Sequence, residues 1–296
     1  MYDGRRVGKD GPFGGSARVI GGKTKLLALI GDPVVHSLSP TMHNAAFAAD
    51  GLDFVYVALN VGADDLPAAV RGAAALGLRG FNITMPHKRA MIPLVDELDE
   101  GADISGAVNT VVIEGQKLRG FNTDGPGMVE ACREAGIRLE GQGVVLLGAG
   151  GAAASIAAAF CDEGIGELYI INRNLEHAGA LAGKLRKAGK RVGIEVHPTD
   201  ALDERTVHAP VILNATPLGM GDGDPLPLPP EYLDEKTALV DAVYRPGAET
   251  ALVRQARERG ANVVTGQRML LYQGVLAQRL WTGRQPNVAA MDEALS

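Results

Sequence analysis

A run of apolar residues that ends in a glycine cluster constrains this chain more than any other stretch. Val144–Leu147 is typical of a buried strand, the glycines that follow allow a tight turn, and small helix-forming residues come next. Gly148, Gly150 and Ala153 have the spacing of a dinucleotide-binding turn. Glycine-rich turns before helices also occur for packing alone, so the turn by itself leaves both interpretations open.

The dinucleotide interpretation has a physical basis at each of the three positions. The first glycine permits the turn, the second lets the backbone approach a pyrophosphate, and the small third residue lets helix and strand pack closely. Backbone N–H groups and the positive end of the helix dipole then face the phosphates. Whether this chain uses its turn in that way depends on the rest of the sequence.

Length and composition are those of a globular protein with two domains. The chain has 296 residues, of which 46% are hydrophobic and 22% charged, so it can bury a substantial core. Its formal net charge is −6 and no basic stripe stands out, which argues against a nucleic-acid partner. The longest early apolar run, Leu26–Ile30, is too short for a signal peptide core or a membrane span.

Cysteine and histidine usage indicates neither a disulfide framework nor a metal centre. The two cysteines, Cys132 and Cys161, lie in helix-like runs without C-x-x-C spacing and are interpreted as small core residues, which fits a reducing compartment. The six histidines show no metal-ligand spacing. We therefore expect a cytoplasmic protein that contacts no membrane and holds no metal.

The N-terminal part begins with a segment that lacks periodic apolar residues. Glycines and scattered basic residues fill it, so we expect residues 1–24 to form a flexible extension. A strand at Leu26–Ile30 follows and ends in turn residues. Ser39 before Pro40 then predicts a helix start with the serine as N-cap, which leaves the hydroxyl of Ser37 in the same loop unexplained.

Polar side chains follow a short strand at Gly80–Ile83. A proline-containing loop carries Thr84, His87 and Lys88, and a helix is predicted to follow through Leu94–Leu98. A lysine at a helix start faces the unfavourable end of the dipole, which is a mild indication that Lys88 has a function. Loops at the carboxyl ends of parallel strands are also where ligands bind in such sheets.

The rest of the chain alternates strands and helices in the manner of a parallel, doubly wound sheet with right-handed crossovers. A hairpin over residues 107–121 leads into it and ends before Asp124, which could cap the next helix. A late helix carries Gln273, a polar residue on an otherwise apolar face. The predicted strands and helices span residues 143–148, 151–163, 167–172, 175–189, 192–196, 210–214, 237–241, 249–259, 261–264 and 267–280.

Taken together, these loops resemble the shikimate dehydrogenase family, NADP-dependent enzymes of the aromatic-amino-acid pathway. The resemblance extends from about Lys25 to Gly283 and rests on nine separated motifs in the family's order. The motifs are Gly31–Pro40 with Met42–Asn44, Asn82–Lys88, Gly106–Thr110, Gly120–Gly125, Gly148–Ala153, Asn172–Arg173, Asn214–Met220, Asp241–Tyr244, and Gly266 with Met269, Leu270 and Gln273. One such match could be chance, whereas nine in register leave little room for it.

The resemblance implies a role for the polar and small residues of these motifs. Lys88 and Asp124 would form the catalytic pair. The residues implied to bind substrate are Ser37 and Ser39 at its carboxylate, Thr84, Asn109, Asp124 and Gln273 at its ring hydroxyls, and Tyr244 nearby. The residues implied to bind the cofactor are Gly148, Ala149, Gly150, Gly151, Ala152, Asn172, Arg173, Asn174, Ala242 and Gly266.

The chemistry of a lysine beside a carboxylate agrees with this reaction. Reduction of a ketone by hydride leaves charge developing on oxygen, which a positioned ammonium can stabilise and protonate. A carboxylate next to Lys88 would fix its orientation and favour its charged form. The lysine would act as acid in ketone reduction and as base in alcohol oxidation.

The strand after the glycine turn indicates which dinucleotide binds. NAD-selective sites usually place Asp or Glu at its end to accept a hydrogen bond from the ribose 2′-OH. Here the strand ends in Asn172, Arg173 and Asn174, and a planar guanidinium suits a 2′-phosphate. NADP is therefore the expected cofactor.

We expect a two-domain α/β protein that reversibly reduces 3-dehydroshikimate to shikimate with NADPH, and a homodimer is considered for its assembly. The expected substrate-binding catalytic domain spans residues 25–123 plus 265–296, and the expected Rossmann-like NADP-binding domain spans residues 124–264. One alternative is an NAD-dependent quinate/shikimate dehydrogenase. Another is a non-catalytic NADP-binding regulator of the same fold. The presence of both Lys88 and Asp124 argues against this second alternative.

Overall fold

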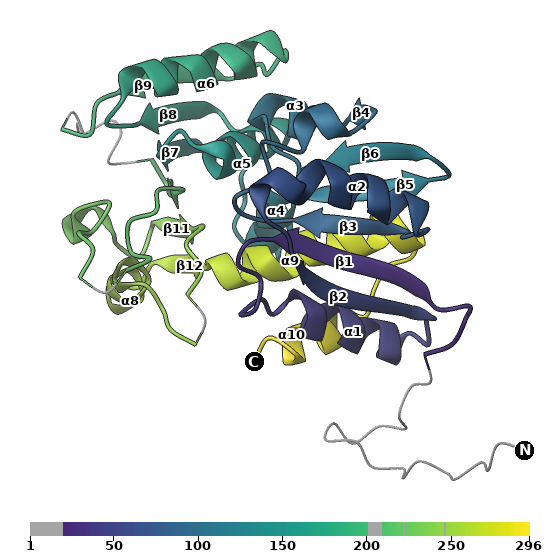
Figure 1. Ribbon diagram of the computed structural model, residues 1–296. Coiled ribbons are helices and arrows are strands. Elements are labelled where there is room, and N and C mark those ends of the chain that lie inside the picture. The colour runs from purple at the N-terminus through teal and green to yellow at the C-terminus, as the bar shows by residue number, and fades with distance from the viewer. Residues whose placement is uncertain (1–19, 201–208, 222, 246) are drawn as a thin grey trace, which may run out of the picture.

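The computed structural model describes residues 20–200, 209–221, 223–245 and 247–296, which form two sheets with helices packed on them (Figure 1). The α/β class expected from the sequence is therefore confirmed. Most of the predicted N-terminal extension, residues 1–19, lies outside the described residues. No helix among those residues has the length and apolar character needed to cross a membrane.

The first sheet is mixed and has the strand order β2-β1-β3-β5-β6-β4 in the described chain. The strand β1 pairs in parallel with β2 and β3, whereas β5 is antiparallel to both β3 and β6. Its strands are β1 (Lys25–Gly31), β2 (Phe54–Asn60), β3 (Gly80–Ile83), β4 (Glu97–Leu98), β5 (Thr110–Glu114) and β6 (Lys117–Phe121). The helical segments along this part are α1 (Ser39–Ala49), η1 (Ala63–Asp65), α2 (Leu66–Ala75), η2 (Ile92–Leu94) and α3 (Glu100–Ser105).

Apolar side chains cover both faces of the first sheet. Leu66 and Val70 of α2 pack with Phe81 of β3 on one face. Phe47 of α1 and Trp281 pack on the other face. Because both faces are buried around β1, this central parallel strand is a nearly continuous apolar run, Leu26–Ile30.

The second sheet is fully parallel, with the order β12-β11-β10-β7-β8-β9. This is the doubly wound order of a dinucleotide-binding fold, whose ligand crevice lies where the order reverses, here between β7 and β10. Its strands are β7 (Gly143–Leu147), β8 (Glu167–Ile171), β9 (Gly193–His197), β10 (Val211–Asn214), β11 (Ala238–Asp241) and β12 (Asn262–Val264). Its helical segments are α5 (Gly151–Asp162), α6 (Leu175–Lys187), η3 (Pro230–Tyr232) and α8 (Ala251–Glu258).

Three further helices connect the two sheets or follow them. They are α4 (Asp124–Glu134), α9 (Gly266–Thr282) and α10 (Val288–Glu293). Figure 1 shows α9 running from the edge of the second sheet back along the first. The crossing of α4 and α9 is close, because a Cβ added at Gly127 would lie 2.6 Å from the backbone nitrogen of Gln273.

Two local predictions were wrong. No α-helix runs through Leu94–Leu98: the chain forms a turn, then η2, then the short strand β4. Pro93 lacks an N–H for a helix interior, and the backbone instead bonds to β6, with Asp99 N donating to Gly120 O at 2.9 Å. Apolar spacing alone could not reveal this edge pairing.

The second error concerns the start of α1. The N-cap position is Leu38, and no side chain caps it. Ser39 already lies inside the helix, and its backbone N–H donates to the hydroxyl of Ser37 at 3.2 Å. The Ser37 hydroxyl, to which the sequence assigned no structural role, therefore accepts the hydrogen bond in this turn. The Ser39 hydroxyl does not cap the helix.

The close helix crossing makes a stability prediction. Gly127→Ala should lower the free energy of unfolding by about 1–3 kcal/mol, because the new methyl group meets the backbone of α9. The matched control is Gly72→Ala on α2, where nothing lies within 4 Å and the substitution should raise stability by about 0.5–1 kcal/mol. Urea unfolding of both variants checks this, and equal stability changes in the two would contradict it.

Acid should destabilise the protein through His43. Its ring is fully buried against Tyr56, and burial lowers the pKa from 6.5 to about 4, although a hydrogen bond to Gln278 opposes this. Since the unfolded chain takes up the proton first, this stability is present above pH 6.5 and is lost as pH falls toward 4. The loss amounts to about 3 kcal/mol.

The measurement is the free energy of unfolding at pH 7 and pH 4.5 for the parent, for His43→Asn and for His36→Asn. We expect the pH-dependent loss to shrink in His43→Asn and to persist in His36→Asn, whose histidine is exposed. The same loss in all three proteins would show that His43 does not carry it.

Candidate functional site

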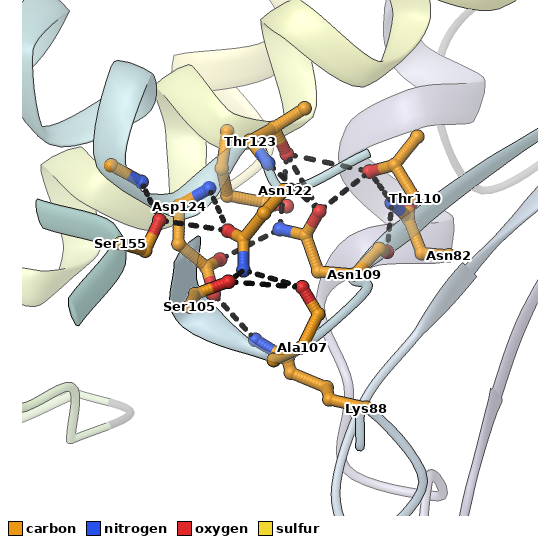
Figure 2. A network of polar contacts seen from close by, with 12 residues as sticks. Asn82, Lys88, Ser105, Ala107, Asn109, Thr110, Asn122, Thr123, Asp124 and Ser155 are labelled. Atoms are coloured by element: carbon orange, nitrogen blue, oxygen red, sulfur yellow. Dashed lines mark hydrogen bonds and ion pairs between the residues drawn. The ribbon is translucent and has the colours of Figure 1, made fainter. Parts of the chain in front are cut away.

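An ion pair between Lys88 and Asp124 lies at the centre of the candidate site (Figure 2). The lysine Nζ is 2.7 Å from Oδ2 of the carboxylate. Lys88 stands in the turn that follows β3, and Asp124 is the first residue of α4. The side chains are 30% and 10% exposed, so the carboxylate is buried while the ammonium still reaches open space.

Asn109 fixes the second oxygen of the carboxylate. Its Nδ2 donates to Asp124 Oδ1 at 2.7 Å. Its own Oδ1 accepts from Thr123 N and from Thr110 Oγ1, both at 2.9 Å. Asn109 precedes β5 and Thr123 follows β6, so the hairpin brings them together at its open end. Asp124 therefore does not cap α4, contrary to the structural alternative read from the sequence.

Asn122 holds this end of the hairpin against the second sheet. Its Nδ2 donates to Ser105 Oγ and to Ala107 O at 3.0 and 2.9 Å. Its Oδ1 accepts from Asp124 N at 3.0 Å and from Ser155 Oγ at 2.9 Å. Ser155 belongs to α5, the helix that the glycine turn opens, so the amide of Asn122 links the backbone N–H of Asp124 to the nucleotide half of the molecule.

The network continues into the first sheet through Asn82 on β3. Its Nδ2 donates to Asn109 O and to Thr110 Oγ1 at 3.0 and 2.9 Å. Its Oδ1 accepts from the Tyr56 hydroxyl at 2.7 Å. All of these groups are buried and hydrogen-bonded, which makes the network rigid rather than costly.

A cavity of about 490 Å³ opens beside the ion pair, and we call it the active cavity. Residues from loops and helices attached to both sheets line it: Ser37, Ser39, Thr84, Lys88, Asn109, Asp124, Tyr244 and Gln273, together with Ala242, Gly266, and Asn82 of β3. All of the residues predicted to bind substrate are therefore brought together. Ala242 and Gly266, predicted at the cofactor, line this same space.

The glycine turn has the geometry that its sequence predicts. Gly148 has φ +105°, and an added Cβ would lie 2.9 Å from Ala215 O, so neither the conformation nor the space suits a side chain. Nothing lies within 4 Å of a Cβ built on Gly150, which leaves its backbone open to a ligand. Ala153 is fully buried where α5 meets the sheet.

A second cavity of about 530 Å³, the nucleotide cavity, lies along this turn. Ala149, Gly150, Gly151 and Asn172 line it, whereas Gly148, Ala152, Arg173 and Asn174 do not. These lining glycines leave backbone exposed beside the start of a helix, so the cavity fits a pyrophosphate.

The end of β8 is organised by the start of α6. The Asn174 side-chain oxygen caps α6 by accepting from Glu176 N and His177 N. Asn172 Nδ2 donates to Asn174 O at 2.8 Å. Arg173 between them is exposed, and no hydrogen bond or ion pair joins its guanidinium to the described residues. No cluster of three or more candidate metal ligands occurs in the described ranges.

Comparison with known proteins gives the family of this chain. Residues 29–111 match the shikimate dehydrogenase substrate binding domain, residues 130–218 match shikimate/quinate 5-dehydrogenase, and residues 266–295 match the shikimate 5′-dehydrogenase C-terminal domain. A shikimate dehydrogenase (NADP(+)) from Rubrobacter xylanophilus is 56% identical over 278 residues, which cover 94% of this chain and 97% of that protein. The chain belongs to the shikimate dehydrogenase family.

Other members of the shikimate dehydrogenase family agree. The shikimate dehydrogenase (NADP(+)) of Moorella thermoacetica is 47% identical over 92% of both chains. The Thermus thermophilus shikimate 5-dehydrogenase, solved in complex with NADP(H) and shikimate, has a TM-score of 0.81 and 39% identity, covering 92% of this chain and 98% of that one. The Listeria monocytogenes enzyme, solved with shikimate and NAD, has a TM-score of 0.88 and 35% identity, covering 94% and 99%.

Several residues of the network were not assigned a role from the sequence. Asn82, Thr110, Asn122 and Thr123 lie within the motifs that carry the shikimate dehydrogenase resemblance, and an amide within the apolar strand β3 was a signal that could have been used. Ser155 gave no such signal, because a serine in a run of alanines is unremarkable in a helix. Its partner across the fold could only be found in three dimensions.

Proposed function

We propose that this protein catalyses the reversible reduction of 3-dehydroshikimate to shikimate with NADPH. The observation that carries the proposal is the Lys88–Asp124 ion pair inside a cavity lined by hydroxyl and amide groups, beside a dinucleotide-type glycine turn. The names of the relatives, shikimate dehydrogenase (NADP(+)), support both the reaction and the cofactor. The proposal includes a cytoplasmic location, which is supported by two free cysteine thiols.

The proton chemistry rests on Lys88. Its ammonium can donate a proton to the oxygen that becomes negative during ketone reduction, and it can take that proton back in the reverse direction. Asp124 holds the ammonium at 2.7 Å and is itself held by Asn109, so the donor is fixed in position before substrate arrives. NADPH supplies the hydride when it is bound.

The lining of the active cavity supports the expected substrate contacts. We assign the substrate carboxylate to the hydroxyls of Ser37 and Ser39, which lie where the loop enters α1. We assign the ring hydroxyls to Thr84, Asn109, Asp124 and Gln273, with Tyr244 nearby. Burial raises the pKa of the Tyr244 hydroxyl, so at neutral pH it remains a neutral hydrogen-bond donor.

For the cofactor we assign the pyrophosphate to the backbone of the glycine turn and the 2′-phosphate to Arg173. The turn residues concerned are Gly148, Ala149, Gly150, Gly151 and Ala152, with Asn172 and Asn174 beside Arg173, and Ala242 and Gly266 toward the active cavity. The Arg173 guanidinium is exposed and has no hydrogen-bond or ion-pair partner among the described residues, and the sequence has no acid at the end of β8, which together support NADP over NAD.

The domain division also stays a proposal. Residues 25–123 with 265–296 would hold substrate and residues 124–264 would hold NADP, a division supported by the separate sheets. Its boundary at 123/124 falls at the start of α4, next to the ion pair. Closure of the two parts over the ligands would follow from this layout. The homodimer considered from the sequence stays a prediction.

Assays with paired substrates test the function. We expect kcat/KM for shikimate oxidation to be at least about tenfold higher than for quinate, since the Rubrobacter xylanophilus and Moorella thermoacetica relatives carry the name shikimate dehydrogenase (NADP(+)). We also expect NADP+ to be preferred over NAD+ by a similar factor. A clear preference for quinate with NAD+ would support the alternative dehydrogenase, and NADPH binding without turnover would support a regulator.

Lys88→Ala should lower kcat by at least about two orders of magnitude, the usual contribution of a positioned acid or base. The KM for shikimate should change much less, because the hydroxyl and amide groups of the cavity remain. Steady-state kinetics beside the control Lys187→Ala, an exposed lysine on α6, check this. An unchanged kcat would remove Lys88 from the mechanism.

A further inference from the structure

The nucleotide cavity is lined by residues from both halves of the molecule. Gly150, Gly151 and Asn172 come from the second sheet and its turns. Arg89 and Ser105 come from segments attached to the first sheet. Any ligand that fills this space therefore meets side chains of both halves, and the glycine turn supplies only one side of its surroundings.

Charge in the nucleotide cavity is of one sign. Its charged lining residues are Arg89 and Lys184, and its lining contains no Asp or Glu, although the whole chain carries a net charge of −6. An anion is the chemistry that such a lining favours. The ammonium of Lys184 has one of its three N–H donors on Ile104 O, at 3.2 Å.

Arg89 has a fixed backbone and an uncommitted side chain. It follows Lys88, whose carbonyl accepts from Val108 N at 2.9 Å. Its own carbonyl accepts from Ile92 N at 3.2 Å. The side chain is exposed, and no hydrogen bond or ion pair connects it to the residues that the structure describes.

The loop that carries Arg89 lies close to the glycine turn. Val108, which anchors Lys88, is next to Ala107, and a Cβ built on Gly151 would lie 3.9 Å from the Cβ of Ala107. The start of α5 thus packs on the segment that supports the Arg89 turn. A phosphate at the N–H groups of Gly150 and Gly151 would lie within this shared space.

We propose that Arg89 binds the diphosphate of the dinucleotide, opposite the backbone N–H groups of the glycine turn. Its guanidinium offers paired donors that match phosphate oxygens, a charge that the glycine turn itself lacks. This deepens the proposed function and rests on it, since it assumes that a dinucleotide fills the cavity. The nucleotide would then contact the residue next to Lys88 and connect both halves of the molecule.

Binding calorimetry with NADPH and NADH tests the assignment without catalysis. Both probes carry the diphosphate and only NADPH carries the 2′-phosphate, so the two arginines should differ. Arg89→Gln should lower the affinity for both NADPH and NADH by about tenfold or more. Arg173→Gln should lower the affinity for NADPH by that factor and change the affinity for NADH little. Arg89→Lys should restore part of the affinity because it keeps the charge.

Arg71→Gln is the matched control, since Arg71 is an exposed arginine on α2 that lines neither cavity. Circular dichroism melts of every variant show that each is folded. The Arg89 proposal is overturned if Arg89→Gln binds both probes within twofold of Arg71→Gln, or if it loses affinity for NADPH alone. Failure of the parent protein to bind either probe would overturn the proposed function as well.

Discussion

The position of one carboxylate determines the geometry of the candidate site. Asp124 has one oxygen on Lys88 and the other on Asn109, at 2.7 Å each. Each partner comes from a different part of the first sheet: the lysine from the turn after β3, and the amide from the entry into β5. The carboxylate therefore joins these two segments. Because β3 pairs with β5, both oxygens of this buried carboxylate have a hydrogen-bond donor.

Asparagine side chains extend the hydrogen-bond network from Asp124 to the surrounding strands and helices. A primary amide can donate twice and accept twice, so one side chain can join several elements without burying a further charge. Asn109 uses this capacity to join the start of the hairpin to Asp124, and Asn122 joins the end of the hairpin to α3 and α5. Asn82 joins β3 to the backbone carbonyl of Asn109 and to the Tyr56 hydroxyl. If Asn109 were a cation instead, it would compete with Lys88 for the carboxylate, and the like charge would disfavour the protonated form of the lysine.

Sequence reasoning succeeded where the information is local, and it failed where tertiary pairing decides. The order of apolar strand, glycine turn and small-residue helix around Gly148 fixes its own conformation, so its prediction was confirmed to within a residue or two. The region around Leu94–Leu98 has helical spacing but pairs with β6, and nothing within it encodes that partner. Likewise, the bond from Ser155 to Asn122 joins residues that only the packing of α5 on α4 brings together.

The long helix α9 brings Gln273 to the active cavity from a start beside the loop that follows β11. It begins at Gly266, where a Cβ would lie 2.5 Å from the carbonyl oxygen of Val243 in the loop after β11. The absence of a side chain lets α9 start against this loop, and about two turns later the helix delivers Gln273 beside the ion pair. The close crossing at Gly127 then fixes the helix against α4, whose first residue is Asp124. Gly127 and Gly266 thus set the position of Gln273 relative to the carboxylate. Both do so because they have no side chain and let the backbones approach closely, not because they make a polar contact.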